Sequence, residues 1–201
     1  MNKQGVIMNI MQNKSIWIAT ALALLMGVTR FNHFGSATML PDASYAVFFL
    51  GGVYLGRTRF AMALLAFLMI EAALVDYYVI NFRDVSGWCV TSAYGFLLLA
   101  YAGLWFIGRW YAPRHDLTGK GLLGLSVTAV AAASLAFVIA NVSFYLLAGY
   151  FGNMSAMEYS ARVAQYFVPY IAVAVMYIGG AIILQMMYAI LTGKQHGAKA
   201  F

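Results

Sequence analysis

The chain has 201 residues, of which 64% are hydrophobic and 9% are charged, and its formal net charge is +6. Soluble domains carry about 45–50% apolar and about 25% charged residues, so this composition excludes an ordinary water-soluble domain and predicts a protein surrounded by lipid. The basic residues sit in short loops between apolar runs, which favours a role in membrane topology and not a nucleic-acid-binding patch.

Six apolar stretches are candidates for membrane-spanning helices, each of which needs about 20 residues to cross the hydrocarbon core. In chain order they cover residues 15–29, 43–55, 60–80, 89–111, 121–150 and 166–191. The first two are short, so we expect part of the segment between them to lie within the membrane boundary, covered by protein or facing water. The sequence shows no linker or second domain and therefore predicts one all-α membrane domain over residues 1–201 with six transmembrane helices.

The basic residues divide unequally between the two ends of these predicted helices. One end carries nine of them, Lys3, Lys14, Arg57, Arg59, Arg109, Arg114, Lys120, Lys194 and Lys199, and the other carries Arg30, Arg83 and Arg162. Lys and Arg accumulate in cytoplasmic loops, so the first end is predicted to face the cytoplasm and both termini to lie inside. A cleaved signal peptide is the alternative interpretation of the first span, and the polar leader before it favours a retained helix.

Residues with versatile chemistry gather at the opposite, outer end. They are His33, Asp42, Asp76, Asp84, Cys89, Glu158 and Arg162, and the aromatic residues Tyr45, Tyr77, Tyr78, Trp88 and Tyr94 accompany them. Small-molecule sites are apolar, aromatic cavities with a few placed polar groups, so the outer half of the bundle is the predicted location of a site. Aromatic residues at helix ends are also typical of the interfacial belt of a membrane protein.

Two acidic residues lie inside the third apolar stretch. Asp76 precedes the end of this stretch by a few residues, where an ionised group is costly, so we predict that it faces the bundle interior, has a partner and belongs to a site or gate. Glu71 lies deeper and has no obvious partner in the sequence, so its role stays open. Glu158 and Arg162 either pair on one helical turn or contribute to a ligand site. His33 is either structural or a ligand.

Cys89 is the only cysteine, which excludes an intrachain disulfide bond. The ordinary interpretation is a small buried apolar side chain. Its place at the mouth of the fourth stretch, close in depth to Asp76, is also suitable for a thiolate that binds a transition metal. A regular helix would turn Cys89 and Tyr94 to different faces, so both reach one pocket only if Cys89 lies in the loop before the helix.

Two segments resemble the BtuM family, solitary S-components that are related to ECF-type vitamin transporters and assigned to cobalamin. Residues 30–50 read RFNHFGSATMLPDASYAVFFL, residues 75–78 read VDYY and residues 87–96 read GWCVTSAYGF. This likeness covers about the first half of the chain, and the expected number of helices extends it to the rest. The resemblance implies a six-helix, S-component-like bundle in a bacterial inner membrane, with its vitamin pocket open to the outer face.

The resemblance also implies roles for individual residues. Cys89 matches the family's cobalt-ligating cysteine, and Asp76 and Tyr94 match residues of the pocket. Arg162 and His33 are weaker matches to substrate-binding positions. A further pair, Ala19 and Ala23, falls where S-components carry the small-residue motif that docks an energising ECF module, although solitary members resemble the others without an evident module of their own.

The sequence therefore predicts binding and uptake of cobalamin as the substrate, with a Cys89 thiolate as axial cobalt ligand and no other cofactor. A soft thiolate donor would favour reduction of cobalt and loss of the upper ligand, so cysteine-dependent decyanation is an accompanying hypothesis. The chain has no GxxxxGK[ST] motif and is not expected to use ATP itself. Two alternatives stay open: a membrane-embedded redox or modifying enzyme that uses the same cysteine, and a structural or assembly subunit of a membrane complex.

Overall fold

A computed structural model describes residues 3–31, 40–83 and 86–193, with side chains described from residue 14 onward. Within these ranges the chain forms helices, turns and loops and contains no strand. The elements in chain order are α1 (Lys3–Arg30), α2 (Ser44–Leu55), α3 (Ala61–Phe82), the 3₁₀ turn η1 (Gly87–Cys89), α4 (Tyr94–Tyr111), the 3₁₀ turn η2 (Ala112–Arg114), α5 (Gly119–Leu147) and α6 (Ala156–Leu191). This confirms the all-α prediction for the described part of the chain.

In the part of the chain that the structure describes, three helices, α3, α5 and α6, are long and apolar enough to cross a membrane. Only 17% of the most apolar stretch of α6 is buried inside the protein, so most of its apolar surface faces outward. Water is a poor solvent for such a surface and lipid is a good one. The fold therefore has the character of a helical membrane protein.

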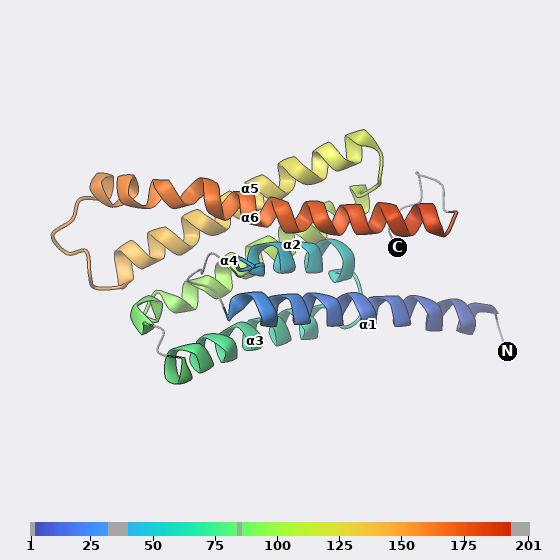
Figure 1. The fold of residues 1–201 in the computed structure, drawn as a ribbon, viewed down its shortest axis with the longest axis horizontal. Coiled ribbons are helices and arrows are strands. Elements are labelled where there is room, and N and C mark those ends of the chain that lie inside the picture. The colour runs from blue at the N-terminus through green and yellow to red at the C-terminus, as the bar shows by residue number, and fades with distance from the viewer. Residues whose placement is uncertain (1–2, 32–39, 84–85, 194–201) are drawn as a thin grey trace.

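The helix α2 lies at the centre of the bundle, between α1 on one side and α5 and α6 on the other (Figure 1). Every residue of α2 is buried except Tyr45 and Tyr54. Its twelve residues span about 18 Å at 1.5 Å per residue, whereas the hydrocarbon core is about 30 Å thick. The protein itself, and not lipid, therefore forms the surroundings of α2.

Glycines allow α2 and α4 to approach closely. A Cβ atom on Gly52 would collide with the backbone carbonyl of Trp105, and one on Gly108 would collide with the backbone carbonyl of Phe49. The ring of Trp105 lies directly against Gly51 and is fully buried. Small residues at a helix contact bring two backbones together, and here they fix α4 against the central helix.

Three helices begin at positions that differ clearly from the predicted spans. The helix α1 begins at Lys3 rather than at residue 15, so its 28 residues correct the prediction that the first span is short. The helix α6 begins at Ala156 rather than near residue 166, because the side chain of Ser155 caps it by accepting a hydrogen bond from the backbone N–H of Glu158 at 3.2 Å. The helix α4 begins at Tyr94 rather than at residue 89, because the chain first makes the turn η1. Cys89 therefore precedes the helix, as a shared pocket with Tyr94 requires.

The Lys3 end of α1 and the Leu191 end of α6 lie at the same end of the bundle (Figure 1). The α3–α4 and α5–α6 connections lie at the opposite end. The first and last helices thus place these two ends together in the bundle, and the placement of both termini in the cytoplasm stays a prediction.

Candidate functional site

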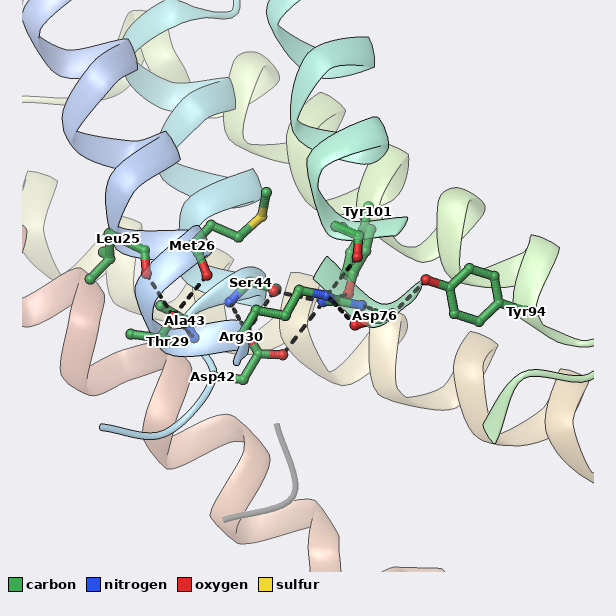
Figure 2. A network of polar contacts seen from close by, with 11 residues as sticks. Leu25, Met26, Thr29, Arg30, Asp42, Ala43, Ser44, Asp76, Tyr94 and Tyr101 are labelled. Carbon is green, nitrogen blue, oxygen red and sulfur yellow. Dashed lines mark hydrogen bonds and ion pairs between the residues drawn. The ribbon is translucent and has the colours of Figure 1, made fainter. Parts of the chain in front are cut away.

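The site is built around Arg30, the last residue of α1, whose side chain turns into the bundle and is only 1% exposed as a residue. Its Nε donates hydrogen bonds to Asp76 Oδ1 at 2.8 Å and to the carbonyl of Ala72 at 3.2 Å, and its Nη2 donates to Asp76 Oδ2 at 2.6 Å. Its Nη1 donates to Ser44 Oγ at 2.9 Å and to the Tyr101 hydroxyl at 2.6 Å. Figure 2 shows how α1, α2, α3 and α4 each supply a member of this network.

A second carboxylate, that of Asp42, completes the network in front of α2. Its Oδ2 lies 3.6 Å from Arg30 Nη1, and its Oδ1 accepts hydrogen bonds from the backbone N–H of Ser44 at 2.9 Å and from Ser44 Oγ at 2.6 Å. One guanidinium thus faces two carboxylates, so the group carries a formal net charge of −1. A buried charge is tolerated only when it is paired and hydrogen-bonded, and the network meets both conditions for Arg30.

Two tyrosines fix the network on α4. The Tyr94 hydroxyl donates to Asp76 Oδ2 at 2.6 Å. The ring of Tyr101 stacks on Phe48 of α2, with ring centroids 4.2 Å apart, and its hydroxyl receives the bond from Arg30. Tyr94 and Tyr101 lie seven positions apart, about two turns of a helix, so one face of α4 presents both hydroxyls to the network.

The prediction that Asp76 faces the interior and has a partner is confirmed, because Arg30 forms a two-bond pair with it. Arg30 itself was expected in an outer loop and is instead the most buried charge among the described residues. A sequence signal was present: a carboxylate inside an apolar run requires a cation at the same depth. Arg30 ends α1 at a depth that brings it to Asp76 on α3.

Cys89 ends the turn η1, outside the helices, and is half-buried. Burial raises the pKa of its thiol, and the negative charge of Asp76 raises it further. The thiol is therefore protonated at neutral pH unless a cation or metal stabilises the thiolate.

Aromatic rings surround the residue before the cysteine. The ring of Trp88 stacks on Tyr150 with centroids 5.3 Å apart and meets the edge of Phe144 at 4.9 Å. Further contacts between rings extend this group to residues of α5 and α6. We call the whole group the aromatic cluster, and its members are Trp88, Phe144, Tyr145, Tyr150, Phe151 and Tyr159. Trp88 and Tyr150 are each 51% exposed, so the aromatic cluster offers open ring surface, and Trp88 directly precedes Cys89 in the chain.

The remaining predicted site residues lie apart from this network. Arg162 is exposed on α6, and its Nη2 donates to Glu158 Oε1 at 2.8 Å, which confirms the pair on one helical turn. Ala19 and Ala23 are half-buried and pack against the hydrophobic core. His33 lies outside the described residues.

Glu71 faces an open groove of about 580 Å³ between α1 and α3, and its Oε2 is buried without a hydrogen-bond partner among the described residues. A second open groove lies near Arg109. Cys89, Asp76 and Tyr94 line neither groove.

The described histidine, cysteine and acidic side chains form no group of three that could hold a bare metal ion. Cys89 alone could supply one ligand to a metal that a macrocycle already holds, much as a single axial side chain holds a haem iron.

Fold and network together define a helical membrane-type protein with a buried charge network at one end of its bundle. A comparison with protein-family models finds no match for the chain, and a search of curated proteins finds none either.

Proposed function

We propose that the protein binds a corrinoid such as cobalamin beside Cys89 and takes part in its uptake across a bacterial inner membrane, as an S-component of the BtuM type. One observation carries the proposal. Cys89 lies half-buried in the turn before α4, directly after Trp88 of the aromatic cluster and shortly before Tyr94, whose hydroxyl donates to Asp76.

The chemistry of these groups suits a corrinoid. The corrin ring supplies four nitrogen ligands to cobalt, so one protein ligand is enough, and a thiolate is a soft donor. Trp88 and Tyr150 would cover the apolar faces of the ring. The Tyr94 hydroxyl donates to Asp76 and keeps lone pairs that can accept from an amide of the corrin periphery.

The proposal includes the placement in the membrane. Six helices would form the membrane domain, with α1, α2 and α4 completing the set that α3, α5 and α6 begin. Both termini would lie in the cytoplasm and Cys89 at the outer face, where the substrate arrives. We also propose that an energising ECF module docks through Ala19 and Ala23. The alternative is that this chain carries out uptake alone.

Absorption spectroscopy of the purified protein with cyanocobalamin tests the cobalt ligand. We expect the cobalt spectrum to change with the wild-type protein and to stay that of free cyanocobalamin with Cys89→Ser. The matched control is Ser92→Ala, an exposed position of the same connection, which should behave as wild type. An unchanged spectrum with folded wild-type protein, or the same change with Cys89→Ser, would end the thiolate assignment.

A growth assay tests uptake separately. Expression of this chain in a cell that lacks its own inner-membrane cobalamin importer should restore cobalamin-dependent growth, and Cys89→Ser should not. If well-expressed wild-type protein fails in a cell without an ECF module but succeeds when one is supplied, transport requires the module. Failure in both cells contradicts the uptake role.

A further inference from the structure

A second open groove, of about 700 Å³, is lined by residues of the α2–α3 connection, the end of α4 and η2. The α2–α3 and α4–α5 connections lie towards the end of the bundle that holds the Lys3 end of α1 (Figure 1). The wall of the groove consists of Arg57, Phe106, Arg109, Trp110, Pro113 and Arg114. Arg57 comes from the α2–α3 connection, and the other five come from the end of α4 and from η2. Three guanidinium groups and two aromatic rings thus share one groove.

The close contact of α2 and α4 brings two of these arginines together. A Cβ atom on Gly56 would meet Cβ and Cγ of Arg109 at 2.9 and 3.1 Å, so the stem of Arg109 lies against the residue that precedes Arg57. Arg114 is held at the groove by Trp110. Its guanidinium lies 4.4 Å from the centre of the Trp110 ring, and its Nη1 donates to the Trp110 carbonyl at 3.0 Å.

None of these three arginines pairs with a carboxylate in the part of the chain that the structure describes. Asp116 is close in sequence, but its Oδ1 accepts from the backbone N–H of Thr118 at 2.9 Å and from the Thr118 hydroxyl. The groove therefore holds three positive charges that no described acidic group neutralises. Arginine recognises phosphate through two parallel hydrogen bonds, so the charges suit a phosphate group.

We propose that this groove binds the phosphate headgroup of an anionic phospholipid. Trp110 is 60% exposed and Phe106 is 44% exposed, and both lie beside the arginines in the wall of the groove. Tryptophan and basic residues together are typical of the headgroup level of a bilayer, and basic pockets between membrane helices bind anionic headgroups. A soluble phosphate would use only the arginines, whereas the glycerol and first methylenes of a lipid would also contact the two rings.

Native mass spectrometry of the purified full-length protein, with phosphatidylglycerol and phosphatidylcholine of the same chains in competition, tests the proposal. We expect phosphatidylglycerol to be retained at least tenfold more strongly. Arg57→Gln and Arg109→Gln should each weaken its retention roughly fivefold, the effect of removing one basic residue from a lipid surface. The matched control is Arg59→Gln, which removes a charge from the same connection but not from the groove and should change retention much less.

Three results would overturn the proposal. The first is equal retention of the two lipids by the wild-type protein. This measurement does not depend on whether any variant folds. The second is an equal loss with Arg59→Gln and Arg57→Gln. The third is displacement of the lipid by millimolar glycerol phosphate, which would mark a site for a soluble phosphate. The inference rests on the proposed membrane placement but not on corrinoid binding, so an unchanged cobalt spectrum would leave it standing.

Discussion

Arg30 shows how a single side chain organises four helices. Its guanidinium contacts groups on α2, α3 and α4, and every contact is with an oxygen that can accept a hydrogen bond. Removal of the guanidinium would leave the Asp76 carboxylate without its two-bond partner in a poorly hydrated region. The cost of breaking a buried pair comes mainly from the partner that stays behind.

We predict that Arg30→Gln lowers the free energy of unfolding by about 3–5 kcal/mol, the range for the loss of one partner of a buried ion pair. The free energy of unfolding is measured by titrating the purified protein with a denaturing detergent. The matched control is Arg162→Gln, which breaks the exposed pair with Glu158 and should cost less than about 1 kcal/mol. Equal effects of the two substitutions would contradict a structural role for the buried network.

Cys89 provides a prediction that needs no ligand. The pKa of its thiol is raised by burial and by Asp76, so the protonated form persists to a higher pH than in an unfolded chain. Alkylation consumes the thiolate, so the midpoint of its pH profile should lie above the value of about 8.5 for a free cysteine. Alkylation of the denatured protein is the control, because Cys89 is the only cysteine. A folded midpoint at or below the denatured one would refute the prediction.

Among the elements, the contact between α2 and α4 sets the positions of most others. The close approach depends on Gly52 and Gly108, at which a side chain would meet the backbone of the opposite helix. A backbone cannot move aside as a flexible side chain can, so even one methyl group forces the helices apart. The network residues on α4 would then shift away from Arg30.

We predict that Gly108→Ala destabilises the protein by about 1–3 kcal/mol, the usual cost of an overpacked core. Gly103→Ala on the same helix is the matched control, because its Cβ would have nothing within 4 Å. Alanine is the better helix former, so this control should be neutral or stabilise by up to about 1 kcal/mol. Thermal unfolding in detergent measures both. A loss of the same size at Gly103 would show that the effect is not one of packing.

The sequence predicted the apolar elements better than their ends. Length and hydrophobicity identify α3 and α5, but the polar beginning of α6 depends on the Ser155 cap and carries no hydrophobic signal. Asp76 was found because a carboxylate is costly in an apolar run. Arg30 was missed, because the sequence alone does not show whether an arginine at the end of a helix points outward or into the bundle.

For the molecule as a whole, the basic residues and the fold agree on one arrangement. The connections between α3 and α4 and between α5 and α6 lie at one end, and the α2–α3 and α4–α5 connections, which carry Arg57, Arg59 and Arg114, lie towards the other (Figure 1). Counting the basic residues in the sequence is enough to predict which connections lie at the same end of the bundle. The sequence could not show that Arg57 and Arg109, which lie far apart in the chain, line one groove, because that depends on the contact between α2 and α4.

We predict that reporter fusions place these two ends on opposite sides of the membrane. Alkaline phosphatase inserted at Gly152, in the α5–α6 connection, should be active, because the enzyme folds only outside the cytoplasm. A fluorescent protein fused to the C-terminus should fluoresce, because it matures in the cytoplasm. The reverse pair of results would invert the proposed orientation. Active phosphatase at Gly152 together with a dark C-terminal fluorescent protein would place both positions outside and refute a membrane crossing by α6 between them.

The central position of the short α2 has a consequence for how the chain is made. A segment of this length is a weak signal for the insertion machinery, and Arg30 leaves the ribosome well before Asp76, its two-bond partner. We therefore expect α1 and α2 to wait at the edge of the translocation channel until α3 arrives, and the three to enter the lipid together. The buried charge would then control the order of assembly during synthesis as well as the finished structure.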